Sequence, residues 1–370
     1  MLEQAYLARG HQVQVWSPQA CFYGRLTRGR LSKWGGYIDQ YVLFPRWVRK
    51  QIKRQPADTL FVFCDQALGP WVPLIKGRPH VVHVHDLLAL RSALGKVPEN
   101  PTSWTGQLYQ RYIRHGFQQA KHFISISNKT RDDLHYFGQV SPVTSEVVYN
   151  GLNYPYAPIL PDEARQVLKQ AGLPVGDEGM LLHVSGNAWY KNVKGIVRMY
   201  AHYARTRHDP LPLWLVGVRI DEKLQVALDE VPPQGEVLFF YGLDNQVLQA
   251  AYSLSRVFLF PSLAEGFGWP IIEAQACGCP VITTGEPPMS EVGGPVARYL
   301  PRLLAGDDVQ AWAKNGADVL VELLSLDAAA RADILAQGVA WAGRFDGDAA
   351  IEGYLHIYRQ VVEWEHTHHL

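Results

Sequence analysis

Short apolar runs rich in β-branched and aromatic residues recur along this chain, and each is followed by a longer segment with helical periodicity. They are residues 13–18, 60–64, 81–86, 123–127 and 146–151 in the first half, and 180–186, 213–218, 237–242, 257–262 and 280–284 in the second. Strands without strict polar alternation, separated by helices, indicate parallel sheets covered on both faces. The pattern therefore predicts an α/β chain with two doubly wound, Rossmann-like domains.

The length of 370 residues also favours two domains, because a single hydrophobic core of that size is uncommon. Residues 150–163 (NGLNYPYAPILPDE) contain three prolines and predict the linker. We expect an amino-terminal domain at 1–158, a carboxy-terminal domain at 159–348, and a last helix at 349–370 that completes the first domain. Ligands of such sheets bind beyond the carboxyl ends of the strands, so the cleft between the domains should hold the chemistry.

The charges of the whole chain cancel, with 35 basic and 35 acidic residues, and this argues against a nucleic-acid partner. The first 54 residues are nevertheless basic, since they contain ten Lys or Arg against Glu3 and Asp39. Basic residues 25–54, interleaved with aromatic ones, predict either contact with an anionic membrane surface or phosphorylated acceptor, or a solvated basic face. No run of 18 uncharged apolar residues occurs. We expect a cytoplasmic enzyme, with the inner face of the membrane as its alternative location.

The first residues, MLEQAYLARGHQVQVW, predict a helix that leads into a strand, with no strand before it. A doubly wound domain normally begins with a strand and a loop that precede this helix. Either an upstream segment is missing or the first sheet is built without it. We expect the natural coding sequence to begin upstream and to supply a strand and a glycine-containing loop.

The stretch AEGFGWPIIE (264–273) follows the apolar run 257–262 and places two glutamates around a Gly-aromatic-Gly turn. Pro270 suits the first position of a helix, and the glycines leave room for a ligand to reach the backbone amides of 267–269. Glu265 would enter the pocket from the loop and Glu273 from the first helical turn. Taken alone, Glu273 could complement the helix dipole and Glu265 could be a surface residue. Together they predict two carboxylates that each grip a vicinal diol.

Residues 264–284 resemble the E-x7-E segment of the retaining, nucleotide-sugar-dependent glycosyltransferases of the group 1 type, which have the GT-B fold. Four other stretches are similar to the same family and extend the resemblance over nearly the whole chain. They are 81–90 (its strand end with the HD pair), 123–138 (a helix start), 183–192 (a diphosphate-binding loop) and 287–300. The resemblance implies two Rossmann-like domains that face a cleft.

The resemblance also implies roles for individual residues. Glu265 would contact the transferred sugar together with the amides of Phe267 and Gly268, and Gly266 would belong to the same donor site. Glu273 would hydrogen-bond the nucleotide ribose. Lys191 would pair with the diphosphate and stabilise the leaving group in place of a metal. His85 would face the reacting centre. No cofactor is implied beyond the nucleotide diphosphate sugar as co-substrate.

Two features depart from the family pattern. Many members carry an arginine where this chain has Gly186, so Asn187 or a residue of the other domain would have to take its place in the diphosphate clamp. The glycine-rich loop after the family's first strand is absent. The motif FDGD (345–348) resembles a metal-binding DxD, but its position before the last helix predicts a helix cap. No metal site is expected.

The sequence thus predicts a glycosyltransferase that moves a hexose from a nucleotide diphosphate sugar to a glycan or lipid-linked acceptor in cell-envelope polysaccharide biosynthesis. Retention of configuration and independence of metal are expected. The alternatives are a catalytically inactive sugar-nucleotide-binding subunit and a GT-B sugar-nucleotide epimerase.

Overall fold

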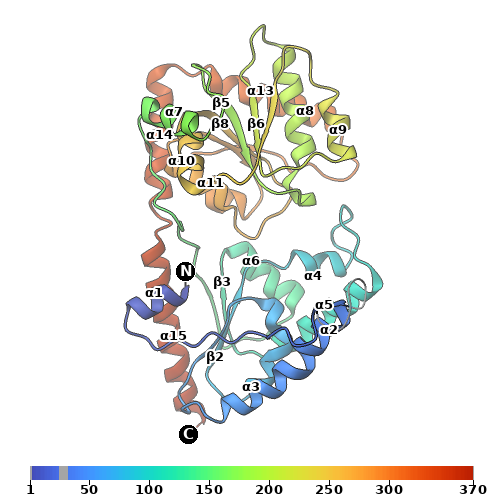
Figure 1. Ribbon diagram of the computed structural model, residues 1–370, viewed down its shortest axis with the longest axis vertical. Coiled ribbons are helices and arrows are strands. Elements are labelled where there is room, and N and C mark those ends of the chain that lie inside the picture. Colours follow the sequence, from blue (N-terminus) through green and yellow to red (C-terminus); the bar gives the residue numbers. More distant parts are fainter. Residues whose placement is uncertain (1, 25–31, 370) are drawn as a thin grey trace.

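A computed structural model describes residues 2–24 and 32–369, and it contains two parallel sheets stacked along the long axis of the molecule (Figure 1). The first sheet has the order β1-β2-β3-β4, with β1 Phe61–Phe63, β2 His80–Val84, β3 His122–Ser125 and β4 Thr144–Val147. The second has the order β10-β9-β8-β5-β6-β7. Its strands are β5 Met180–Val184, β6 Leu213–Val216, β7 Val237–Phe240, β8 Ser255–Phe260, β9 Val281–Thr284 and β10 Arg298–Leu300. The predicted α/β class with two doubly wound sheets is confirmed.

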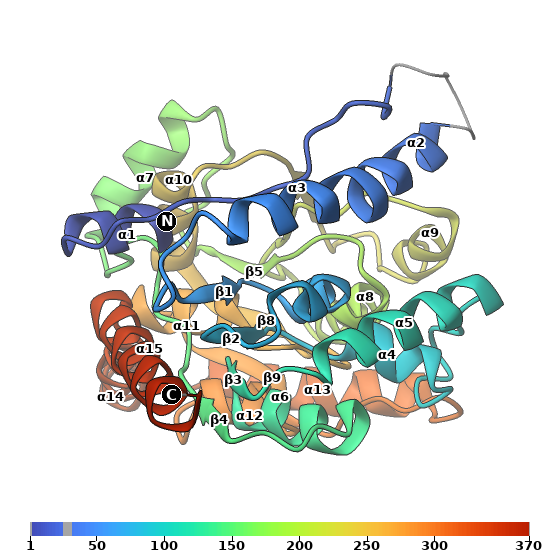
Figure 2. The same ribbon diagram turned by 90° about the horizontal axis from the view of Figure 1, so that it is seen from below.

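The helices of the first half surround the first sheet (Figure 2). They are α1 Leu2–Ala8, α2 Ser32–Ile38, the π-helix η1 Asp39–Leu43, α3 Phe44–Ile52, the 3-10 helix η2 Gln66–Ile75, α4 Leu88–Ala93, α5 Trp104–Phe117, α6 Asn128–Asp133 and the π-helix η3 Leu134–Gly138. Residues 25–31, part of the basic segment noted above, lie outside the described residues.

Except for α15, which packs on the first sheet, the helices of the second half cover both faces of the second sheet. They are α7 Pro161–Gln170, the 3-10 helix η4 Trp189–Lys191, α8 Val193–Arg205, α9 Glu222–Leu228, α10 Asn245–Leu254, α11 Trp269–Ala276, α12 Met289–Gly293, α13 Val309–Leu324, α14 Ala328–Ala342 and α15 Gly347–His369. One core joins Phe258 and Phe260 to α10 and α11, and the other joins Leu181 and Leu213 to α8 and α13. Because both faces are buried, the strands read as continuous apolar runs.

The last helix, α15, returns from the second sheet to the first (Figure 1). Its residues Ile351, Leu355 and Val361 form a core with Val81 of β2 and Ile124 of β3. The short helix α1 packs on the same cluster. One face of the first sheet is therefore covered by the two ends of the chain.

The expected strand at 13–18 is wrong, because residues 11–20 have no regular secondary structure. Val15 is exposed, and the Trp16 ring packs edge-on against Trp47 and Phe61 at centroid distances of 5.3 and 5.6 Å. The aromatic side chain thus holds this segment by packing without backbone pairing. A strand that we did not expect, β10, pairs with β9 at the edge of the second sheet.

Candidate active site

Lys191 and Glu265 form an ion pair at the carboxyl ends of neighbouring strands β5 and β8. The Lys191 Nζ lies 2.7 Å from the Glu265 Oε1, and the two side chains are 15% and 9% exposed. Lys191 ends η4, and the backbone N–H of Leu263 donates to the Tyr190 carbonyl at 2.7 Å, which ties the two loops together. The ammonium also lies 4.8 Å from the centroid of the Phe260 ring, a cation–π contact. The structure therefore brings together two of the predicted site residues.

The surroundings of this pair raise the pKa values of two carboxyl groups at the site, those of Glu265 and Asp86. Burial raises the pKa of the Glu265 carboxyl, while the neighbouring Lys191 ammonium works in the opposite direction. Burial also raises the pKa of Asp86, which follows His85 and acts as a like charge on Glu265. The Lys191 ammonium is suited to an anionic ligand, since the phosphate of such a ligand can replace the Glu265 carboxylate as its partner.

The glycine loop between β8 and α11 runs against the first half of the chain. A Cβ added at Gly266 would overlap the carbonyl oxygen of His85, so a side chain has no room there. Gly268 adopts a φ of +109° and is the N-cap residue of α11, a conformation that favours glycine. Phe267 is buried against Phe345. Glycine is thus needed at position 266 because the two halves of the chain approach each other closely there. The sequence pattern alone did not indicate this approach.

Glu273 lies one residue further into α11 than expected, because the helix begins at Trp269. Pro270 is therefore its second residue, and Glu273 belongs to the second turn. The Tyr252 hydroxyl donates to the Glu273 Oε2 at 3.0 Å. Burial raises the pKa of Glu273, and the hydrogen bond from Tyr252 opposes that shift. The second glutamate is thus held by α10 at the side of the glycine loop.

His85 follows the last residue of β2 and is half-buried. Its ring Nε2 lies 2.8 Å from the Cys64 carbonyl oxygen, and since a carbonyl only accepts, Nε2 carries the proton. Nδ1 is then the acceptor of the ring. The His85 backbone is adjacent to Gly266, so the histidine lies beside the loop that carries Glu265.

Gly186 and Asn187 lie between β5 and η4, where the family pattern places an arginine. A Cβ at Gly186 would meet open space. The Asn187 side-chain amide is engaged on both sides, because it accepts from the Arg219 backbone N–H at 2.6 Å and donates to the Arg219 carbonyl at 2.5 Å. This pairing sets the exposed Arg219, which follows β6, beside the same loop.

Residues at the amino end of α6 contact the glycine loop and were not predicted as site residues. The Ser127 and Thr130 hydroxyls donate to the Gly266 carbonyl at 3.0 and 3.2 Å. Ser127 is also the N-cap of α6, which the sequence FISISN indicates but does not connect with the other half of the chain. Glu291 of α12 approaches the same helix end.

The described part of the chain contains no group of three or more His, Cys, Asp or Glu side chains that could hold a metal ion. Asp346 of the FDGD motif accepts from the Ala349 backbone N–H at 2.7 Å, so it caps α15 as expected. None of the described helices has the length and apolar character that crossing a membrane requires.

Solved structures with the same fold include a glycosyltransferase and a protein bound to UDP and glucose. WaaG, a glycosyltransferase involved in lipopolysaccharide biosynthesis, superposes with a TM-score of 0.68 at 17% identity, covering 96% of this chain and 95% of that one. Anabaena Alr3699/HepE, solved in complex with UDP and glucose, superposes with a TM-score of 0.65 at 16% identity, covering 96% and 88%. The chain therefore has the GT-B fold.

Two family models match, and they divide the chain between them. Residues 1–154 match Glycosyltransferase Family 4, and residues 164–306 match Glycosyl transferases group 1. Both halves of the chain are therefore similar to glycosyltransferase families, and residues 164–306 are similar to group 1.

Curated relatives are also glycosyltransferases. The O-antigen chain mannosyltransferase B of Escherichia coli is 26% identical over 190 residues, covering 50% of this chain and 49% of the relative. The D-inositol 3-phosphate glycosyltransferase of Mycobacterium avium is 27% identical over 300 residues, covering 77% and 64%. The chain thus spans about half to two-thirds of the length of these relatives.

Proposed function

We propose that the protein transfers a hexose from a nucleotide diphosphate sugar to a glycan or lipid-linked acceptor, with retention of configuration and without an essential metal. The observation that carries the proposal is the buried Lys191–Glu265 pair beside the glycine loop, at the junction of the two sheets. The relatives named for O-antigen and inositol phosphate glycosylation, and WaaG, support a role in cell-envelope polysaccharide biosynthesis.

In this proposal each residue acts on a different part of the donor. Lys191 turns from Glu265 to the diphosphate and stabilises the negative charge that develops when the bond to the anomeric carbon breaks. Glu265, relieved of its partner, contacts the sugar together with the amides of Phe267 and Gly268. Glu273 accepts from the ribose hydroxyls. His85, with Nδ1 free to accept, faces the acceptor side.

Independence of metal is tested directly by the transfer reaction. Transfer from UDP-, GDP- and ADP-hexoses to lipid-linked sugars should continue in EDTA, because Lys191 and helix amides carry the diphosphate charge. Abolition by EDTA with rescue by manganese would refute metal independence. Donor binding without any turnover would favour the inactive subunit, and a change of sugar still attached to its nucleotide would favour the epimerase. Product stereochemistry, read from the anomeric coupling in NMR spectra, tests retention.

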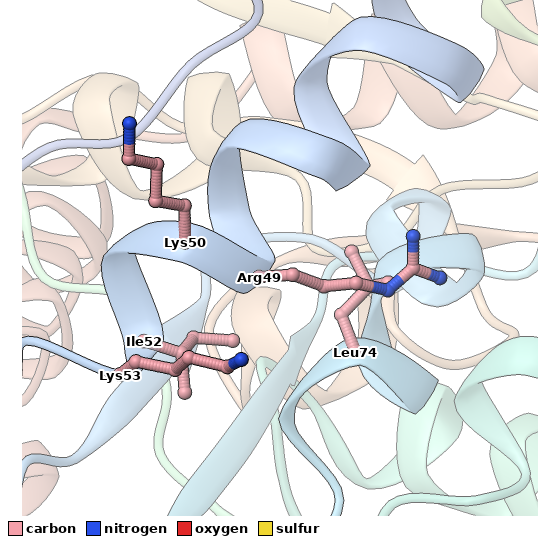
Figure 3. Close-up of a pocket in the computed structure, with 5 residues that line it drawn as sticks. All are labelled: Arg49, Lys50, Ile52, Lys53 and Leu74. Carbon is pink, nitrogen blue, oxygen red and sulfur yellow. The ribbon is translucent and has the colours of Figure 1, made fainter.

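We also propose a cytoplasmic location with contact to an anionic membrane surface through α2 and α3. Trp34 and Trp47 are 67% and 43% exposed there. A hollow of about 500 Å³ beside α3 is lined by Arg49, Lys50, Ile52, Lys53 and Leu74. Figure 3 shows Arg49 and Lys53 extending toward Leu74, while Lys50 extends away from them. Amphipathic helices with aromatic and basic residues bind the headgroup region of anionic bilayers.

Vesicle sedimentation tests this contact. The protein should bind vesicles of equal parts phosphatidylglycerol and phosphatidylcholine and leave pure phosphatidylcholine vesicles unbound. Arg49→Glu with Lys53→Glu should abolish binding, whereas the control pair Lys169→Glu with Lys223→Glu, exposed on the second half, should retain it. Equal binding by both pairs of variants would exclude this face.

A further inference from the structure

Glu291 of α12 connects the two halves of the molecule through the amino end of α6. Its carboxylate accepts from the backbone N–H groups of Asn128 and Lys129, both at 2.9 Å. It also accepts from the Asn128 side-chain amide at 3.2 Å and from the Tyr149 hydroxyl at 3.0 Å. A carboxylate at the positive end of a helix is favoured, and these bonds satisfy N–H groups that have no partner within the helix.

The same end of α6 holds the glycine loop from a second direction. Ser127 and Thr130, which are 0% and 2% exposed, donate to the Gly266 carbonyl. Glu291 and Gly266 therefore both reach from the second half of the chain to one helix end of the first half. Glu291 therefore adds a second set of contacts between α6 and the half of the chain that carries Gly266.

The opposite end of the loop is tied down in a similar way. The Arg302 Nε donates to the Leu263 carbonyl at 2.7 Å, and its Nη2 lies 3.3 Å from the Glu99 Oε1 in the first half of the chain. Glu265 lies between these two anchor points. The loop that carries Glu265 is thus held at Leu263 and at Gly266, and each hold includes a contact with the first half.

We infer that Glu291 is a positioning residue that couples the docking of the two halves to the geometry of the Glu265 loop. This inference rests on the proposed function. With the halves docked, α6 and the His85 backbone lie against Gly266, so that the acceptor side and the donor side of the site meet. Without Glu291, the backbone N–H groups of Asn128 and Lys129 lose their partner, and the two sides separate while the second half keeps its own nucleotide-binding residues.

The experiment compares Glu291→Ala and the isosteric Glu291→Gln with wild type, with Glu291→Asp as the conservative variant. Glu286→Gln, an exposed neighbour preceding α12, is the matched control. In Glu291→Ala the kcat for transfer should fall about tenfold or more, while the Kd for the free nucleoside diphosphate should stay within about twofold. Small-angle scattering should show a larger radius of gyration than wild type. Glu291→Gln, like Glu291→Ala, should lower the kcat and enlarge the radius of gyration. Glu291→Asp should keep most of the wild-type kcat.

A scattering curve that superposes on that of wild type, or an unchanged kcat in Glu291→Ala, would overturn the inference. The inference would also be overturned if Glu291→Ala lost as much nucleoside diphosphate affinity as kcat. A general structural defect lowers both the affinity and the kcat. If the wild type transfers no sugar, the proposed function fails by itself. The radius of gyration and the nucleoside diphosphate affinity then still decide the role of Glu291.

Discussion

Glu273 is the residue to which we assign the ribose of the donor. It is half-buried on α11 and receives a hydrogen bond from Tyr252, so its carboxylate is already fixed before a ligand binds. Glu273→Ala should weaken binding of the matching nucleoside diphosphate by about 1.5–3 kcal/mol, the value of a charge-assisted hydrogen bond. Isothermal titration calorimetry measures this, with Tyr252→Phe as a control that keeps the carboxylate. Unchanged affinity in Glu273→Ala would remove the ribose assignment.

Arg219 is our candidate for the cation that the family pattern places at Gly186. Its backbone is held by the Asn187 amide, and its exposed side chain follows the buried Val218. Arg219→Ala should weaken nucleoside diphosphate binding about tenfold, since a guanidinium bonds phosphate strongly. Arg207→Ala, exposed after the carboxyl end of α8, should leave the affinity unchanged. Equal nucleoside diphosphate affinities of the two variants would show that Arg219 does not supply the cation that the family pattern places at position 186.

Among the elements, α15 stabilises the first sheet by packing on one of its faces. The Tyr358 hydroxyl lies 2.7 Å from the His83 Nε2 and 3.1 Å from the Tyr6 hydroxyl, and thus joins α15 to β2 and α1. Tyr358→Phe should lower the free energy of unfolding by about 1–3 kcal/mol, because it leaves a buried ring nitrogen without its partner. Urea unfolding measures the change. Tyr112→Phe, on the exposed face of α5, should change it little, and equal effects would mean that the buried contact adds no stability.

The elements also show what the sequence predicts well and what it does not. The runs at 180–186 and 257–262 predicted β5 and β8 because both faces of these strands are buried, and the glycines at 266 and 268 placed the loop before α11. The run at 13–18 also contains β-branched and aromatic residues, yet its Trp16 is held by packing against other rings. Composition alone does not distinguish these two cases.

In the candidate site, local sequence patterns predicted the residues that lie on loops at the ends of neighbouring strands. The loop motifs indicated Lys191 and Glu265, and their pairing follows from adjacent strands ending at one edge. The contacts of Glu291, Ser127 and Gly266 join residues more than 130 positions apart. Nothing in the local pattern of either segment specifies such a partner, so these contacts required the structure.

At the scale of the whole molecule, buried histidines make stability depend on pH. Burial lowers the pKa of His83 to about 3 and that of His183 to about 4. An unfolded histidine takes up a proton near its ordinary pKa of about 6.5, whereas the folded one stays neutral. The contribution of each buried histidine to the free energy of unfolding is therefore complete above pH 6.5. Below that pH it falls by at most about 1.4 kcal/mol per pH unit for each group.

His83→Gln isolates one of these groups, because glutamine does not titrate and can still hydrogen-bond Tyr358. Between pH 6 and 5, the free energy of unfolding of the variant should fall less steeply than that of wild type, by about 1 kcal/mol per pH unit. Urea unfolding at a series of pH values gives both slopes. Parallel slopes would show that His83 does not stay neutral in the folded protein.

The central claim is that the two halves of the chain form a donor site around Lys191 and Glu265. Titration calorimetry of UDP-, GDP- and ADP-hexoses into wild type and Lys191→Met tests it most directly, with Lys194→Met, an exposed lysine on α8, as the control. One donor class should bind wild type and the control with the same affinity, and its affinity for Lys191→Met should be at least about tenfold lower. Binding of none of the three donors to wild type, or equal affinity for Lys191→Met, would contradict the claim.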